Sequence, residues 1–353
     1  MTVLKLGSLF DGIGVFPLAA VHCGMEPVWA SEIEARPISI TKRHFPDMLH
    51  LGDITKISGA EIPPVDVITF GSPCQDLSQI GTRNGFAGKK SSLFYQAMRI
   101  IEEMRYATNG RYPAFCIWEN VAGAFSSNDR LDFAAMLSAF TGAEVSVPSR
   151  GWAHAGMVRG GRADTAWRLL DAQYWGEPAL VQRRKRVFVV ADFAGQRAGE
   201  VLFKPRTVLP FSTISGPGGL SATQRGGVPA AQTGRQVPVV RPFSLRRMRT
   251  MAQVGDQKGF CASFGRGGEP FPTLLASVTA PFSFWYEGEE RDGFLRVLTP
   301  LECERLMGLP ENWTKYGCKN EEISDHARYR ALGNSIALPC AEYVMAGIAE
   351  VMN

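Results

Sequence analysis

Cys74 is the residue whose surroundings best suit a nucleophile. It stands in Gly71-Ser72-Pro73-Cys74-Gln75, directly after the apolar run Val65–Phe70, which predicts a buried strand. A loop at the end of a strand can present a thiolate, the reactive form, to a substrate. An inert core cysteine normally lies within an apolar run, as Cys116 does. We therefore predict that Cys74 acts as a covalent nucleophile and that Cys116 belongs to the core.

A carboxylate and a group of cations adjoin two other predicted strands. Glu119 follows the apolar run Phe115–Trp118, and burying a carboxylate is costly unless it is used or paired. A helix cap or a structural salt bridge is the alternative for Glu119. Arg184 and Arg186 precede another apolar strand, and alternation turns both the same way. We expect the two arginines to point towards the site that contains Glu119.

A third group of residues has the spacing of a nucleotide site. Phe10-Asp11-Gly12-Ile13-Gly14 lies where a predicted strand turns into a helix, and Glu32 follows Gly12 at the distance typical of an acid that binds ribose hydroxyls. Asp53, after the third strand, is placed to bind an adenine amino group. The alternative is a glycine turn with two helix caps. Pro17 occupies the last position of the G-x-G-x-x-G pattern, which favours a nucleoside cofactor without pyrophosphate.

Alternating strand-like and helix-like segments position these residues. The strands are expected at Val3–Phe10, Glu26–Ser31, Met48–Leu51, Val65–Phe70, Phe115–Trp118 and Arg186–Ala191. The helices are expected at Pro17–Cys23, Ala35–His44, Ser91–Met104, from Pro300 onwards, and at Leu338–Met352. This alternation predicts a doubly wound, mostly parallel α/β sheet, with ligands at the carboxyl ends of its strands.

The composition changes after about residue 195. Residues 196–285 are rich in Gly, Pro, Ser, Thr and Arg, and residues 196–266 contain eleven Lys or Arg and two acids. We predict a first domain of residues 1–195 and 299–353, on which the last helix packs back. Residues 196–298 would form a smaller, irregular β-rich domain. Its excess of positive charge suits contact with phosphates and base edges.

The bulk composition describes a globular chain. It has 353 residues, of which 45% are hydrophobic and 20% charged, and a net charge of +4 that is weak evidence for any partner. No signal peptide or long apolar span is recognisable, so we expect a cytoplasmic protein without a membrane anchor. The seven cysteines form no C-x-x-C pair, which argues for free thiols and against a zinc site.

Taken together, these motifs resemble the DNA (cytosine-5) methyltransferase family of bacteria and phages. The matching segments are Phe10–Gly14, Gly71–Gln75, Glu119–Val121, Gln182–Arg186, Arg296 with Leu298–Glu302 and Leu309-Pro310, and Gly333–Ser335. Their order and spacing match across nearly the whole chain, which makes the set far more specific than each motif. The resemblance implies a Rossmann-like methyltransferase sheet, with residues 196–298 as the target-recognition domain.

The same resemblance implies the reaction, its substrates and the roles of individual residues. Cys74 would attack carbon 6 of a flipped-out cytosine in double-stranded DNA, while Glu119, Arg184 and Arg186 hold the base. S-adenosylmethionine would be the cofactor and S-adenosylhomocysteine its product. The cofactor site would comprise Phe10, Gly12, Ile13, Gly14, Glu32, Asp53, Ile54, Pro73, Asn334 and Ser335. The DNA contacts would comprise Gln75, Ser78, Arg83, Arg246, Arg247, Arg249 and Thr273.

The resemblance also implies a monomer that acts near the nucleoid, with a cognate restriction endonuclease acting separately, and no metal. The sequence departs from the family pattern at Val15, at Leu332 and at residues 179–181, which separate Pro178 from Gln182. The departure at 179–181 bears on where the following arginines lie.

Three other functions fit some of these motifs. A tRNA cytosine-5 methyltransferase of the same fold shares the Pro-Cys-Gln and Glu-Asn-Val motifs, although the long basic region favours DNA. A catalytically inactive DNA-binding relative is disfavoured by intact Cys74, Glu119 and Arg186. A thiol redox enzyme is disfavoured because no second cysteine is near Cys74.

Overall fold

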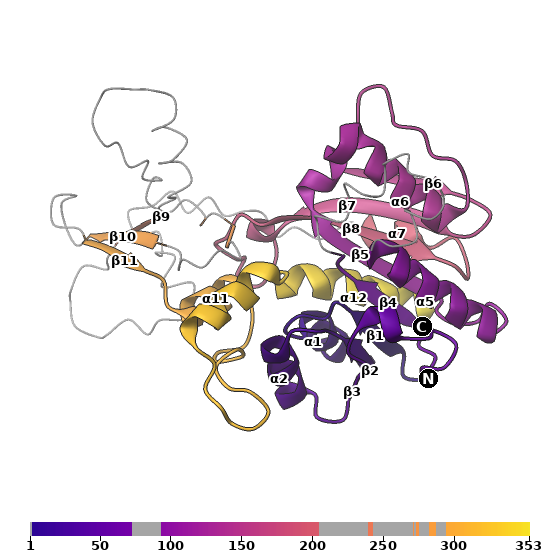
Figure 1. Cartoon of the computed structure of the whole chain (residues 1–353). Coiled ribbons are helices and arrows are strands. Elements are labelled where there is room, and N and C mark those ends of the chain that lie inside the picture. The colour runs from indigo at the N-terminus through magenta and orange to yellow at the C-terminus, as the bar shows by residue number, and fades with distance from the viewer. Residues whose placement is uncertain are drawn as a thin grey trace.

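An eight-stranded sheet forms the centre of the molecule (Figure 1). The computed structural model describes residues 2–72, 93–204, 239–242, 271, 273–274, 282–286 and 294–353. The sheet order is β3-β2-β1-β4-β5-β8-β7-β6. The strands are β1 (Lys5–Leu9), β2 (Glu26–Ser31), β3 (Leu49–His50), β4 (Val67–Phe70), β5 (Phe115–Val121), β6 (Ala155–Arg159), β7 (Asp164–Asp171) and β8 (Lys185–Asp192).

The strand directions divide the sheet into two parts. Strands β3, β2, β1, β4 and β5 are parallel, as the alternation of strands and helices predicted. The pairs β5·β8, β8·β7 and β7·β6 are antiparallel, so the expectation of a mostly parallel sheet holds for only five strands. Strands β6 and β7 were not predicted, and they join β8 as a meander that reverses the chain direction.

Helices cover both faces of the sheet, and the side chains of each strand alternate between two apolar cores. Phe115 and Ile117 of β5 contact the core that contains helices α1 and α12, whereas Cys116 and Trp118 contact the core that contains α5 and α6. The prediction that Cys116 is a core residue is therefore confirmed. The helices are α1 (Val15–His22), α2 (Ala35–His44), α5 (Leu93–Ala107), α6 (Leu131–Thr141), α7 (Ala198–Leu202), α10 (Pro300–Leu306), α11 (Asp325–Asn334) and α12 (Leu338–Met352).

The C-terminal segments return to the eight-stranded sheet and its helices. Helix α12 packs on α1 and α7, and its Val344, Met345 and Ile348 are fully buried, as the sequence predicted for this helix. Helix α10 begins with a capping box, in which Thr299 accepts from the backbone N–H of Glu302 and Glu302 accepts from that of Thr299. In the described part of the chain no single helix is long and apolar enough to span a membrane, and only the bent pair α11 and α12 meets the length and composition criteria together.

A second, three-stranded antiparallel sheet lies within the region predicted as a β-rich domain. Its order is β11-β10-β9, formed by β9 (Val239–Pro242), β10 (Phe282–Tyr286) and β11 (Phe294–Val297). Figure 1 shows this sheet apart from the main one, on the side of α11, and in the chain β11 is followed by α10 and α11. The limits of the two domains at residues 195 and 299 stay predictions.

Gly7 in β1 gives a test of how tightly the sheet packs. A methyl group at this position would collide with the indole of Trp29, which is fully buried beside it. We expect Gly7→Ala to lower the free energy of unfolding by about 2–3 kcal/mol, in the range of overpacked cores. Thermal unfolding of the purified variant measures this. Gly161→Ala is the matched control, because nothing lies within 4 Å of its added methyl group; equal unfolding temperatures for the two variants would contradict the packing argument.

Candidate active site and cofactor pocket

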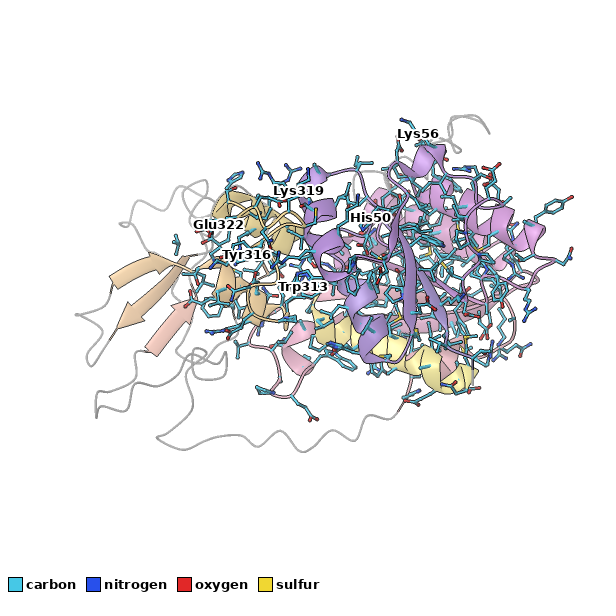
Figure 2. The ribbon with its side chains drawn as sticks, turned by 90° about the horizontal axis from the view of Figure 1, so that it is seen from below. His50, Lys56, Trp313, Tyr316, Lys319 and Glu322 are labelled. Atoms are coloured by element: carbon cyan, nitrogen blue, oxygen red, sulfur yellow. The ribbon has the colours of Figure 1, made fainter. Side chains whose placement is uncertain are left out.

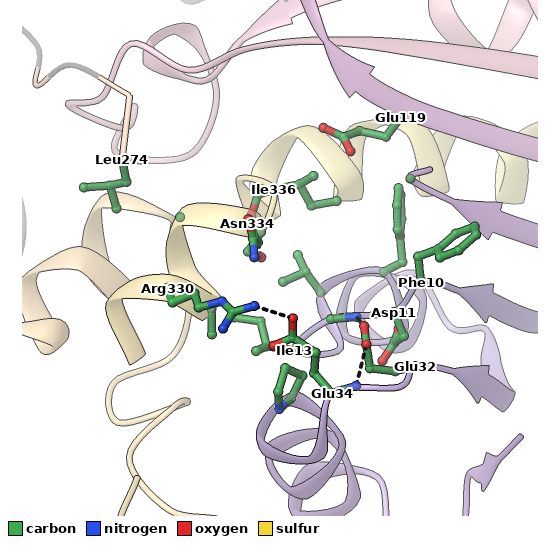
Figure 3. A pocket seen from close by; sticks show the side chains of 18 of the residues that line it. Phe10, Asp11, Ile13, Glu32, Glu34, Glu119, Leu274, Arg330, Asn334 and Ile336 are labelled. Carbon is green, nitrogen blue, oxygen red and sulfur yellow. Dashed lines mark hydrogen bonds and ion pairs between the residues drawn. The ribbon is translucent and has the colours of Figure 1, made fainter. Parts of the chain in front are cut away.

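A cavity of about 890 Å³ opens at the carboxyl edge of the parallel strands. Segments from both ends of the chain surround it, as the labelled residues in Figure 3 show. The lining comes from Phe10–Ile13, Val15 and Phe16, Glu32, Glu34, Arg36 and Pro37, Gly71 and Ser72, Glu119–Val121, Arg186, Thr273 and Leu274, His326, Ala327, Arg330, Ala331 and Gly333–Ile336. This is the edge at which doubly wound sheets bind ligands.

The loop between β1 and α1 forms one wall of the cavity. Phe10, Gly12 and Gly14 adopt positive φ angles of 54°, 60° and 77°. Such angles cost a phenylalanine free energy and cost glycine almost none, so the glycines permit the tight turn and Phe10 is held in it by its surroundings. The predicted cofactor residues Phe10, Gly12 and Ile13 line the cavity, and Gly14 is the N-cap of α1.

Glu32 stabilises the conformation of this loop. One carboxylate oxygen accepts from the backbone N–H of Gly12 at 2.9 Å, and the other accepts from those of Ile33 at 2.7 Å and Glu34 at 2.9 Å. Glu32 also lines the cavity. The acid that the spacing singled out therefore lies where a ribose could reach it, and it fixes the loop as well.

Asp11 is a feature of the loop that the sequence analysis did not single out. Both of its carboxyl oxygens are buried without a well-formed hydrogen bond. Burial raises the pKa of this carboxyl to about 7, and the nearby Glu32 adds to the effect, while the hydroxyls of Ser8 and Thr41 oppose it. The signal in the sequence was an acid inside a glycine turn, whereas the hydroxyls beside its carboxyl come from Ser8 of β1 and Thr41 of α2.

The other predicted cofactor residues divide into two pairs. Asn334 and Ser335, at the end of α11, line the cavity. Asp53 instead caps the short helix Ile54–Lys56, accepting from the Thr55 N–H at 2.9 Å and its hydroxyl at 2.8 Å, and Ile54 is buried. Asp53 and Ile54 are not among the lining residues, so the helix-cap alternative fits Asp53 and their contact with a cofactor stays a prediction.

Glu119 and Arg186 meet at the far side of the cavity. Arg186 Nε lies 3.0 Å from Glu119 Oε1, and each side chain is little exposed, at 13% and 12%. The two atoms are close enough for an ion pair, but the angles at Glu119 Oε1 do not make a well-formed hydrogen bond. Burial raises the pKa of Glu119, and the charges of Arg186 and Arg184 act against this rise. A carboxyl group of raised pKa at a cavity wall is suited to holding or sharing a proton.

The antiparallel direction of β8 brings these two residues together. In the β5·β8 ladder Val121 pairs with Arg186 and Glu119 pairs with Phe188. The amino end of β8 therefore lies at the same edge of the sheet as the carboxyl end of β5. The additional residues 179–181 do not separate Arg186 from Glu119.

Arg184 has a different role from the one that the sequence suggested. Its side chain is 1% exposed and does not line the cavity. The guanidinium donates to the backbone carbonyls of Leu274 at 2.9 Å and Gly333 at 2.8 Å, and also to that of Ser335. The expectation that Arg184 and Arg186 point alike into the site is thus wrong for the described geometry, because the guanidinium of Arg184 binds three backbone carbonyls in two other segments of the chain.

The end of β4 is tied to β5 next to the predicted nucleophile. The buried Ser72 accepts at its carbonyl from Asn120 Nδ2 at 3.0 Å and at its hydroxyl from Trp118 Nε1 at 3.2 Å. A methyl group on Gly71 would lie 3.1 Å from Glu119 Oε2, so the absence of a side chain lets the carboxyl lie beside this backbone. The chain thus reaches the cavity wall at Ser72, directly before Pro73.

Several predicted residues lie outside the described residues. These are Pro73, Cys74, Gln75, Ser78 and Arg83, together with Arg246, Arg247 and Arg249. Thr273 is described: it lines the cavity, and its hydroxyl donates to the Arg183 carbonyl at 2.6 Å. In the described ranges no group of three or more His, Cys, Asp or Glu is placed to hold a metal ion.

The structure adds a charged rim that the sequence analysis missed. Arg330 of α11 forms an ion pair with Glu34 at 2.7 Å across the cavity mouth, and both residues line it. His326 and Arg36 are also part of the lining. The sequence contains little indication of the Arg330–Glu34 ion pair, because α11 was not predicted and the two residues are far apart in the chain.

Comparisons with known proteins agree with this geometry. The model of the family "C-5 cytosine-specific DNA methylase" matches residues 4–205 and 245–350. Type II methyltransferase M1.ScrFI of Lactococcus lactis subsp. cremoris is 26% identical over 99% of this chain and 78% of its own length. A protein of Escherichia phage P1 named DNA N-6-adenine-methyltransferase is 24% identical over 98% of this chain, which spans 61% of that protein.

A solved structure shares the fold. It is that of a putative DNA modification methyltransferase encoded within a prophage of E. coli, with a TM-score of 0.60, 18% sequence identity and 99% of each chain covered. The doubly wound methyltransferase fold predicted from the sequence is therefore confirmed.

Asp11 should make stability depend on pH. An acid whose pKa is about 7 when folded and 3.8 when unfolded binds more protons in the folded state, so the free energy of unfolding falls as pH rises from about 4 to about 7. Asp11→Asn cannot ionise, so we expect its stability relative to the natural chain to rise over this window. Three pKa units correspond to at most about 4 kcal/mol. Thermal unfolding from pH 4 to 8 measures this.

Asp47→Asn, at an exposed position, controls for the loss of one carboxylate. A pH-independent difference between Asp11→Asn and the natural chain would show that Asp11 does not carry the proton.

Proposed function

Because the chain belongs to the C-5 cytosine-specific DNA methylase family, we propose that the cavity beside Glu119 and Arg186 is where it methylates cytosine in DNA. The family confirms the sequence prediction of a DNA cytosine-5 methyltransferase. The observation that carries the assignment of the site is the buried Glu119–Arg186 pair at the cavity wall, next to the backbone that leads to Cys74.

Glu119 and Arg186 have the chemistry that a cytosine ring requires. Addition of a nucleophile to carbon 6 places negative charge on the ring, and a proton shared with N3 lowers the barrier. The raised pKa of Glu119 favours the protonated form that can make this contact. Arg186, held beside it at 3.0 Å, supplies a positive charge for the base oxygen.

Cys74 is the proposed nucleophile, two residues beyond Ser72. Its thiolate would add to carbon 6, after which carbon 5 of the ring would form a bond to the methyl group as the methyl–sulfur bond breaks, with S-adenosylhomocysteine as the leaving group. A base then removes the carbon 5 proton, and elimination of the thiolate restores the ring. Ser72, fixed by Asn120 and Trp118, anchors the start of this segment. A cytosine must leave the duplex to be reached, so base flipping is part of the proposal.

The described cavity fits S-adenosylmethionine. When bound, this cofactor supplies an activated methyl group on a positively charged sulfur. Glu32 is an acid that lines the cavity, which favours a cationic ligand with ribose hydroxyls. The backbone turn Phe10–Gly14 permits close approach, and Asn334 and Ser335 close the other side.

Double-stranded DNA is the proposed substrate, and residues 196–298 are the proposed target-recognition region. Thr273 and Leu274 bring part of this region to the cavity wall. A separate restriction endonuclease, a monomeric state and a cytoplasmic location are carried as further expectations from the sequence.

Covalent trapping tests the proposed mechanism. With DNA that contains 5-fluorocytosine at the target, fluorine in place of the carbon 5 proton blocks elimination of the thiolate, so we expect a stable protein–DNA adduct that depends on S-adenosylmethionine. Denaturing gel electrophoresis and peptide mass spectrometry should place it on Cys74. Cys74→Ser should form no adduct, whereas Cys318→Ser, at an exposed site, should form it normally. An adduct with Cys74→Ser would contradict the proposed mechanism.

Mass spectrometry of methylated products separates the alternative substrates. We expect 5-methylcytosine in duplex DNA and no product with tRNA. N6-methyladenine, the product that the name of the phage P1 relative implies for that protein, would overturn the assignment to cytosine. Methylation of tRNA alone would favour the RNA enzyme of the same fold.

Replacement of Glu119 tests the proton at the base. Glu119→Gln keeps the shape but cannot supply a proton, so we expect kcat to fall about 100-fold or more, the usual scale for a general acid. The natural enzyme should lose activity as pH rises through the pKa of Glu119, and the variant should lack this limb. Steady-state kinetics between pH 4 and 9, from below the usual pKa of a glutamate upwards, measure both effects. Glu102→Gln, at an exposed ion pair, is the control; a Glu119→Gln enzyme within threefold of normal kcat would contradict the role.

A further inference from the structure

We propose that Trp313 is a positioning residue for the cofactor loop, whose conformation it fixes through the carbonyl of Ile13. The inference rests on the proposed function, because it assigns this loop to S-adenosylmethionine. Trp313 Nε1 donates to the Ile13 carbonyl at 2.8 Å, across 300 residues of sequence. The two side chains are 5% and 1% exposed, so water does not compete for this hydrogen bond.

Several polar backbone groups of the loop are held from outside it, by the end of β2, by α2 and by Trp313. The Gly12 N–H is bound by Glu32 and the Gly12 carbonyl by the hydroxyl of Thr41 in α2. The Asp11 N–H donates to the Ser31 carbonyl of β2. The Ile13 carbonyl is bound by Trp313, from the C-terminal part of the chain. The neighbouring strand β2 and helix α2 thus hold Asp11 and Gly12, and Trp313 adds the contact to the Ile13 carbonyl.

The Ile13 carbonyl lies at a point where the backbone could otherwise change conformation. It is flanked by Gly12 and Gly14, which tolerate many φ angles, so the peptide between Ile13 and Gly14 has little intrinsic preference. A buried carbonyl without a donor costs free energy, and rotation of this peptide would relieve it. Loss of the indole N–H should thus favour loop conformations other than the one that lines the cavity.

Trp313 is itself held rigidly. Its indole stacks on the imidazole of His44, with ring centroids 3.6 Å apart and planes 5° from parallel. His44 Nε2 lies 2.8 Å from the Trp313 carbonyl and must donate there, because a carbonyl can only accept. Figure 2 shows Trp313 and Tyr316 on the C-terminal segment, where it lies beside the N-terminal part of the chain.

A buried ion pair fixes the turn around Trp313 from the other side. Glu304 of α10 is fully buried and accepts from the backbone N–H groups of Asn312 at 2.8 Å and Thr314 at 2.9 Å. Arg328 of α11 neutralises it at 3.1 Å. Since α10 follows directly after β11, the segment that returns from the small sheet sets the position of the indole that holds the cofactor loop.

Trp313→Phe tests the proposal, because it keeps an aromatic ring and removes the N–H. We expect the dissociation constant for S-adenosylhomocysteine, measured by isothermal titration calorimetry, to rise about tenfold. We also expect kcat at saturating S-adenosylmethionine to stay within about twofold, and the affinity for DNA to be unchanged. A tenfold change corresponds to about 1.4 kcal/mol, the scale of one buried hydrogen bond.

Trp167→Phe is the matched control. Trp167 is 6% exposed, its Nε1 donates to the Ala153 carbonyl at 3.0 Å, and it does not line the cavity. Both variants should lose similar thermal stability, but only Trp313→Phe should bind S-adenosylhomocysteine more weakly. Normal affinity in Trp313→Phe, or an equal loss in Trp167→Phe, would overturn the proposal. Failure of the natural protein to bind S-adenosylmethionine or S-adenosylhomocysteine would instead overturn the proposed function.

Discussion

The assembly of the site depends on the hydrogen bonds that the buried guanidinium of Arg184 donates to backbone carbonyls. A charge that is 1% exposed needs partners, and Arg184 finds them in the carbonyls of Leu274, Gly333 and Ser335. Leu274 lies in the segment between β9 and β10, and Gly333 and Ser335 lie at the end of α11, while Arg184 itself immediately precedes β8. One side chain thus joins the edge of the main sheet to two segments that close the cavity. Removing it would leave several buried carbonyls without donors.

The reversal of direction at β8 is the second constraint. A parallel strand at this position would carry its amino end, and Arg186 with it, to the opposite edge of the sheet from Glu119. The meander β6–β7–β8 makes β8 antiparallel, so Arg186 reaches the carboxyl edge and meets Glu119 at 3.0 Å. Burial and the positive charge then act on Glu119 in opposite directions, and burial has the larger effect on its pKa. The chemistry proposed for the cytosine ring follows from this topology.

The side of the cavity proposed for the cofactor depends on contacts from both ends of the chain. The loop there has left-handed backbone conformations at Phe10, Gly12 and Gly14. The glycines allow these conformations, but the local sequence does not select them over others. Glu32 and Thr41 hold it from nearby elements, and Trp313 holds it from the segment that returns from the small sheet. The same enclosure removes Asp11 from water and raises its pKa. The two proposed ligand sites therefore share one framework, in which the proposed recognition region leads into the residues that shape the proposed cofactor loop.

The sequence by itself determined the local features of this protein. Helices α2 and α12 and strand β2 have the predicted limits, because the spacing of apolar residues is a local property. Phe10, Glu32, Glu119 and Asn334 were found because they follow strands or form short motifs, and they do line one cavity. Only the tertiary structure decided the direction of β8, the carbonyl partners of Arg184, the cap made by Asp53 and the bond from Trp313 to Ile13. These depend on pairing between residues far apart in the chain, and no local pattern of side chains specifies such a pairing.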